Sequence, residues 1–122
     1  MAPRRQDPGR LPAAAAMVLA SALLAAACAG SRPVSVSLAG LAAHQEDYKG
    51  KLVTTRGVVR RFADTAGTYF VVEDAEHDRV EVLPPSRMAR YQGRQVQVTG
   101  RFGVNQTVGR FVRVERVSLG GG

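Results

Sequence analysis

The chain is poor in the side chains on which most catalytic and redox chemistry depends. It has one cysteine, two histidines and no tryptophan, and only 6% of its 122 residues are aromatic. A single cysteine excludes an internal disulfide, and His44 and His77 leave few combinations for a metal site or for a nucleophile with its base. We therefore expect no catalytic residues, no cofactor and no metal.

A long apolar run is also missing. Met1 to Arg10 are polar and basic, and the apolar stretch from Leu11 to Ala27 is rich in alanine and interrupted by Pro12. A membrane-spanning helix needs about 20 strongly apolar residues, so this stretch would be marginal as a permanent spanning helix. The order of a basic, an apolar and a small-residue segment is typical of a bacterial export signal, so we expect residues 1–27 to be a signal peptide.

The segment Leu24-Ala25-Ala26-Ala27-Cys28 resembles the lipobox of bacterial lipoproteins, although Ala25 stands where leucine is usual. In that family the cysteine receives a thioether-linked diacylglycerol and, after cleavage, a further fatty acyl chain such as palmitate. The resemblance implies that Cys28 is lipidated and anchors the chain to a membrane of the cell envelope, facing the periplasm or the exterior. Two or three acyl chains at one residue give a stable anchor.

Two alternatives remain for the same leader. Ala25-Ala26-Ala27 also fits an ordinary signal-peptidase site, whose cleavage would release a chain that begins with Cys28, and the leader could instead stay as an uncleaved anchor. Residue 29 is alanine and not aspartate, the residue that in many Gram-negative lipoproteins retains the protein at the inner membrane. In a Gram-negative host the outer membrane is therefore the expected destination.

The remaining chain is basic and rich in valine and glycine. From Cys28 onward it has 14 basic and 9 acidic residues, an excess that suits anionic partners such as nucleic acid, lipid headgroups or acidic polymers without choosing among them. Residues 28–36 have no periodicity and are expected to form the lipidated cysteine and a flexible tether. Residues 37–119 would form the domain, and residues 120–122 a disordered tail.

Alternating apolar and polar residues predict a mainly β domain of five strands. The expected elements are a short helix over Ser37–Tyr48, strands over Lys51–Phe62, Thr68–Asp74, Arg79–Leu83, Arg94–Phe102 and Arg110–Leu119, and one helical turn over Ser86–Tyr91 between the third and fourth strands. Gly57 within the first strand suggests a bulge or a sharp bend. In Arg94–Phe102, Val96, Val98, Gly100 and Phe102 share one face. This order is the plan of the OB-fold, a partly open Greek-key barrel.

The phrases YKGKLVTTRGVV (48–59), YFVVED (69–74), VEVLPP (80–85) and YQGRQVQVTGRF (91–102) also resemble those of small bacterial OB-fold domains, both the anticodon-binding type and exported or lipid-anchored members. The resemblance covers most of the domain and implies its turns and core more than an activity. Exported haem chaperones with this fold attach haem through a histidine near the C-terminal end. No histidine follows His77, so that function is not expected.

OB barrels bind ligands over their second and third strands and in the flanking loops. Here these regions supply Arg60, Arg61, Tyr69, Arg101, Asn105, Gln106 and Arg110 as candidate ligand-binding residues. We expect the four phenylalanines to belong to the core, so that Tyr69 is the main aromatic available for stacking. The acidic segment 73–78 around His77 lacks the spacing of a calcium loop and the soft ligands of a zinc site, so we expect a solvated turn there.

These features predict a lipid-anchored binding or scaffold module of the cell envelope, without catalytic activity, that engages an anionic ligand or an envelope protein. The alternative is an oligonucleotide- or oligosaccharide-binding protein that uses the face of strands two and three. Nucleic acid is possible as a partner but is not favoured, because an exported protein does not normally meet it.

Cells that express the full chain should incorporate a fatty-acid probe into the protein, and Cys28→Ser should abolish the label because no other thiol is available. Labelling is read by electrophoresis of the immunoprecipitated protein, with Ser31→Ala as a control that leaves the cysteine intact. Label that persists in Cys28→Ser would show that lipidation does not occur at this residue.

Overall fold

The computed structural model describes residues 32–120, so the predicted signal peptide and Cys28 lie outside the described residues. This part of the chain is mainly β. Its elements are β1 (Val34–Ser35), α2 (Leu38–Ala43), α3 (Gln45–Tyr48), β2 (Leu52–Asp64), β3 (Gly67–Glu73), β4 (Arg79–Leu83), the 3-10 turns η1 (Pro85–Arg87) and η2 (Ala89–Tyr91), β5 (Gln95–Asn105) and β6 (Gly109–Leu119).

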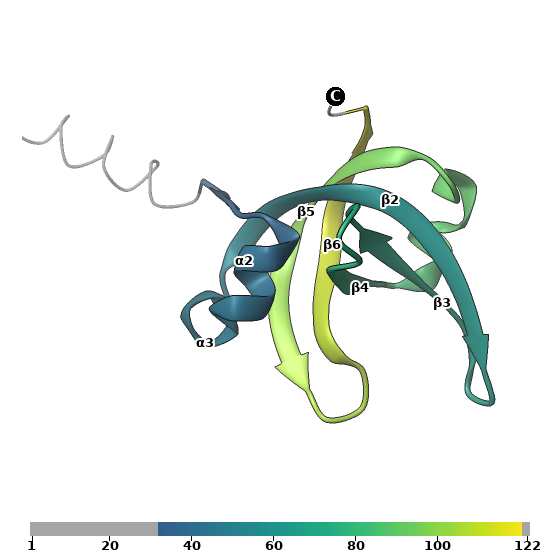
Figure 1. Cartoon of the computed structure of the whole chain (residues 1–122), viewed down its shortest axis with the longest axis horizontal. Helices are drawn as coiled ribbons and strands as arrows, with labels where there is room; N and C mark the ends of the chain where they lie inside the picture. Colours follow the sequence, from purple (N-terminus) through teal and green to yellow (C-terminus); the bar gives the residue numbers. More distant parts are fainter. Residues whose placement is uncertain (1–31, 121–122) are drawn as a thin grey trace, which may run out of the picture. The chain divides into compact units, whose positions relative to one another are not determined.

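The six strands form one mixed sheet that closes into a ring (Figure 1). Its order is β1-β2-β3-β4-β6-β5, and β5 also pairs with β2. The long strand β2 closes the ring because its first half pairs with β5, from Leu52 to Val58, and its second half pairs with β3, from Val58 to Asp64. The β4–β6 and β1–β2 pairs are parallel and the others antiparallel.

The strand alternation predicted from the sequence places the core inside this ring. On β5, Val96, Val98, Gly100 and Phe102 are buried, as predicted, whereas Gln95 and Arg101 are exposed. The interior is filled mostly by valine together with Phe70, Phe102 and Met88. A β-branched side chain suits a curved, pleated wall, since its restricted χ1 loses little further freedom there.

The expected N-terminal helix is present but divided in two. The Ser37 hydroxyl accepts a hydrogen bond from the Gly40 N–H, and Leu38 and Leu41 of α2 pack into the core. The backbone leaves helical geometry at His44, so that α3 is a separate turn of four residues. Among residues 32–120, no helix has the length and apolar character needed to cross a membrane.

The structure corrects three details of the predicted fold. The sheet has six strands and not five, because Val34 and Ser35, within the predicted tether, pair with Val53 and Thr54. The single helical turn after β4 is a pair of 3-10 turns. β5 continues to Asn105, beyond the predicted end at Phe102, because residues 103–105 pair with the start of β6.

Two glycines allow backbones to approach closely inside the ring. A Cβ at Gly57 would lie 2.8 Å from the Glu73 nitrogen, at the point where β2 passes from one neighbour to the other. A Cβ at Gly100 would overlap the Arg113 carbonyl, beside the irregular register between β5 and β6. Since both obstacles are backbone atoms, no side-chain rotation relieves them.

Gly100→Ala should lower the free energy of unfolding by about 2–3 kcal/mol or more, because β6 must move to admit the methyl group. Gly50→Ala is the matched control: Gly50 has φ of +78° and open space around its Cβ position, so only the conformational cost of about 1 kcal/mol applies. Urea unfolding at constant m-value measures both. Equal losses in the two variants would contradict the close approach at Gly100.

Candidate functional site

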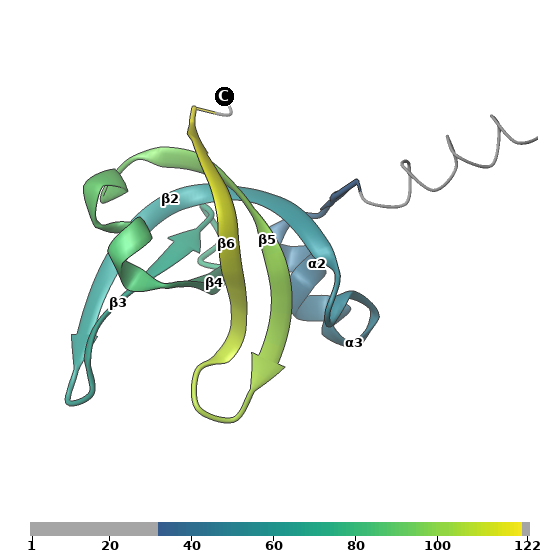
Figure 2. The same ribbon diagram turned by 180° about the vertical axis from the view of Figure 1, so that it is seen from behind.

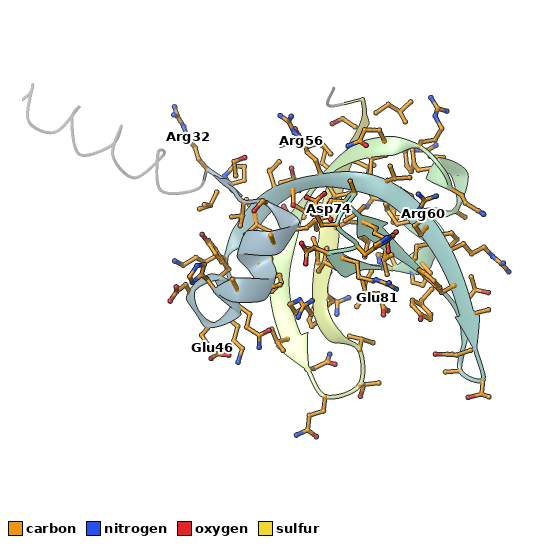
Figure 3. The ribbon with its side chains drawn as sticks, viewed as in Figure 1. Arg32, Glu46, Arg56, Arg60, Asp74 and Glu81 are labelled. Atoms are coloured by element: carbon orange, nitrogen blue, oxygen red, sulfur yellow. The ribbon has the colours of Figure 1, made fainter. Side chains whose placement is uncertain are left out.

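A cleft of about 560 Å³ lies on the outer side of β3 and β4. The β2–β3 hairpin and the β5–β6 hairpin stand on either side of it, and Glu81 of β4 lies in the space between them (Figure 3). Strand alternation explains the position: Phe70, Val72, Val80 and Val82 point into the core, so the residues between them point outward. The sheet itself therefore forms the floor of the cleft.

The cleft combines apolar, acidic, basic and hydroxyl groups. Its lining residues are Tyr69, Val71, Arg79 and Glu81 on the floor, Pro85 at one end, and Asp64, Ala66, Gly67, Thr68, Thr107, Val108, Gly109 and Arg110 from the two hairpins. Val71 is only 3% exposed although it lies outside the core cluster. Other residues therefore cover nearly all of its side chain. A concave site that combines apolar surface with a few polar groups is typical of ligand-binding clefts.

Two phenylalanines predicted to be core residues lie on the outer surface. Phe62 stacks on Tyr69, with ring centroids 5.7 Å apart, and both side chains are half-buried. Phe111 lies over Gly103, where a Cβ would meet the ring at 2.5 Å. Since Phe62 and Phe111 are outside the core cluster, the outer surface has more aromatic area than Tyr69 alone.

A nearly buried carboxylate, Glu73, binds two arginines of this surface. Glu73 is 8% exposed, and its oxygens lie 3.5 Å from Arg60 Nε and 3.3 Å from Arg79 Nη2. The His77 Nδ1 is a third neighbour, at 3.6 Å. Arg79 also lies over the Phe62 ring, 5.1 Å from its centroid. Arg60, predicted to bind a ligand, therefore pairs with Glu73 and does not line the cleft.

The acidic groups of the cleft are not balanced in this way. Among residues 32–120, Glu81 forms neither an ion pair nor a hydrogen bond. Partial burial raises the pKa of the Glu81 carboxyl, and the negative charge of Asp64 raises it further. The Asp64 Oδ1 accepts hydrogen bonds from the N–H groups of Ala66 and Gly67, which shape the β2–β3 turn. Glu81 therefore lies in the cleft without a cation of the described chain at ion-pair distance.

Arg110 contributes to the same cleft a hydrogen-bond donor without a partner among residues 32–120. It is half-buried in the wall of the cleft, and its Nε is one of two buried side-chain polar atoms in the described chain that have no hydrogen-bond partner, the other being Thr55 Oγ1. A buried donor without an acceptor costs free energy in the unliganded protein. Arg110 therefore brings an unsatisfied donor to the wall of the cleft.

Of the seven predicted ligand-binding residues, only Tyr69 and Arg110 line the cleft. Arg61 pairs with Phe70 across the β2–β3 ribbon, which places it on the face opposite Tyr69. Arg101 lies on the outside of β5 and donates to the Gly50 carbonyl at 3.3 Å. The Asn105 Oδ1 accepts from the N–H groups of Thr107 and Val108, so this side chain shapes the β5–β6 turn. Gln106 is exposed in the same turn, outside the cleft.

Three charged residues of the cleft were not among the predicted ligand-binding residues: Asp64, Arg79 and Glu81. The alternating pattern of Arg79–Leu83 could have predicted two of them. Because the valines of this strand point into the core, Arg79 and Glu81 point outward. The β3–β4 link, by contrast, is the exposed turn that the sequence predicts, and the Asp74 Oδ1 accepts from the N–H groups of Glu76 and Asp78. Among the described residues, no three His, Cys, Asp or Glu side chains are grouped to hold a metal ion.

Comparison with protein-family models finds none that matches the chain, and comparison with curated proteins finds no significant match. The arrangement of the cleft is therefore interpreted from its own chemistry. Its groups can accept hydrogen bonds, donate them, form ion pairs and stack against a ring.

The raised pKa of Glu81 gives a pH dependence of defined sign. The folded chain holds this proton more tightly than the unfolded chain, so the stabilisation is present below the ordinary pKa of glutamate and is lost as pH rises through the folded-state pKa. Glu81→Gln should therefore be more stable than the wild type at neutral pH and lose less stability between acidic and neutral pH.

Thermal unfolding at a series of pH values measures this difference, with Glu115→Gln, an exposed glutamate on β6, as the control. Coincident stability profiles for the wild type and Glu81→Gln would contradict the assigned sign.

Proposed function

We propose that this protein is a lipid-anchored binding module of the cell envelope, held at the membrane by Cys28, which binds a partner in the cleft between its hairpins without catalysing a reaction. The ring β2-β3-β4-β6-β5 would be an OB-type barrel, with β1 as an addition at its edge. Support for this assignment comes from the strand order, the parallel β4–β6 pair, the closing β2–β5 pair and the helical turns between β4 and β5.

The unpartnered groups of the cleft carry the proposal. Arg110 Nε has no acceptor and Glu81 has no cation, although both line the same cleft. On a surface that only faces water, such groups would be exposed, and solvent would form hydrogen bonds with them. Partial desolvation of unpaired polar groups in a concave site is what a binding site requires before its ligand arrives.

The charges in the cleft favour one kind of partner. A polyanion such as a nucleic acid would meet Glu81 and Asp64, while Arg79, the arginine on the floor, is already bound to Glu73. A protein segment with a lysine or arginine side chain would instead place its cation against Glu81 and a carbonyl oxygen against Arg110. We therefore favour an envelope protein as the partner over an oligonucleotide.

An oligosaccharide is the second candidate, and the stacked pair of Phe62 and Tyr69 favours it. A sugar ring can lie against an aromatic face while its hydroxyl groups donate to a carboxylate and accept from a guanidinium. Glu81 and Arg110 are placed in the same cleft as Tyr69 and offer both kinds of partner.

A photocrosslinking residue at Thr107, in the exposed wall of the cleft, should give a discrete adduct in living cells that express the full chain. The same residue at Gln95, exposed at the start of β5, is the matched control. Glu81→Arg in the Thr107 background should reduce the adduct at least tenfold, because it replaces an attractive charge with a repulsive one.

The nature of the adduct decides between the two candidates. An adduct that a protease removes supports an envelope protein as the partner, whereas one that resists the protease and is removed by a muramidase supports an oligosaccharide. An adduct of equal yield at Gln95 and Thr107, or no adduct at Thr107, would refute the cleft as the binding site.

A further inference from the structure

The charges of the barrel are segregated along the chain. Residues 62–83 contain six acidic residues and one arginine, whereas residues 84–119 contain seven arginines and one acidic residue, Glu115. The first segment forms the end of β2, β3, β4 and the β3–β4 link, which we call the acidic side of the barrel, and the second forms η1, η2, β5 and β6. The cleft takes lining residues from both segments.

The outer faces of β2, β5 and β6 and the turn η1 bring five arginines together. Strand register places Arg101 directly opposite Arg113, Thr99 opposite Arg116 in the next row, and Arg56 opposite Gln97 in the row after that. Arg87 reaches the same strands and donates to the Glu115 carbonyl at 3.4 Å. We call this set the basic face: Arg56, Arg87, Arg101, Arg113 and Arg116. β5 and β6 run side by side across the barrel in Figure 2.

The pair of Arg101 and Arg113 is electrostatically unfavourable on its own. Like charges directly opposite each other on antiparallel strands repel, and within residues 32–120 neither arginine has an ion pair. Arg113 instead lies over the Phe111 ring, 5.9 Å from its centroid. An anionic surface against this pair would relieve the repulsion.

The N-terminal end of the domain enters the sheet in one of these rows. Ser35 of β1 pairs with Thr54. The Thr54 hydroxyl lies 2.7 Å from the Thr99 hydroxyl, and Thr99 pairs with Arg116 on the other side of β5. Only six peptide steps separate Val34 from Cys28, so the chain between them spans at most about 20 Å. If Cys28 is acylated, as the proposed function requires, Val34 at the edge of the barrel lies no more than about 20 Å from the anchored residue, so the barrel can approach the headgroups to within one Debye length, about 8 Å at physiological salt.

We propose that the basic face docks on an anionic phospholipid surface. The argument from tether length rests on the proposed anchor, whereas the charge segregation and the Arg101–Arg113 pair do not. The acyl-free domain should therefore bind anionic vesicles by itself, weakly and with strong dependence on salt.

The test uses an acyl-free chain that begins at Ala29, which contains every strand of the ring, and co-sedimentation with vesicles of phosphatidylglycerol or phosphatidylcholine. Binding should occur with phosphatidylglycerol only and weaken in high salt. Arg101→Ala/Arg113→Ala should reduce the partition coefficient about tenfold or more. Arg60→Ala/Arg61→Ala removes the same charge from the second half of β2 and should retain most of the binding, provided that thermal unfolding shows both variants folded.

Equal binding to the two lipids, or equal losses in the two double variants, would overturn the basic face as a docking surface. Self-association of the wild-type chain without vesicles, abolished by Arg101→Ala/Arg113→Ala, would also overturn it and would point to the acidic side of a second copy as the partner. These outcomes are independent of the anchor, since fatty-acid labelling of Cys28 can succeed or fail whatever the acyl-free chain does.

Discussion

The ring depends on one strand that serves two neighbours in succession. β2 pairs with β5 and then with β3, and the exchange occurs at Val58, directly after Gly57. There the backbone of Glu73 lies where any Cβ on residue 57 would have to be. The same backbone contact therefore allows the sheet to close and fixes Glu73 at the seam. The position of its carboxylate on the outer surface follows from the closure.

That carboxylate organises the charges around it. Glu73 pairs with Arg60 and Arg79. These two cations are therefore less available to the anionic ligands that a basic protein would be expected to attract. The formal charge of the whole chain, +7, is consequently a poor guide to the cleft, where the groups without partners are a carboxylate and one guanidinium nitrogen. Local pairing, and not net charge, determines what each surface can bind.

Much of the fold was predictable because strand alternation is a short-range signal. The positions of β4 and β6 and the buried face of β5 follow from residues two apart along the chain. Phe62 and Phe111 were misassigned because a phenylalanine on an outer face gives the same local pattern as one in the core. Only long-range partners, Tyr69 for Phe62 and Gly103 for Phe111, reveal their positions. The cleft was predictable in part, through Tyr69 and Arg110, whereas the arginines that pair elsewhere could not be recognised without the register.

The parallel pairing of β1 with β2 has a mechanical consequence. Any tension applied through the N-terminal segment reaches the barrel first at Val34 and Ser35, which hold to Val53 and Thr54 in register, and at Val36, whose N–H donates to the Thr54 carbonyl. This short strand is joined to the edge of the ring and is not part of its closure. Its two register pairs can therefore separate, and lengthen the N-terminal connection by a few residues, while the pairs that close the ring stay intact.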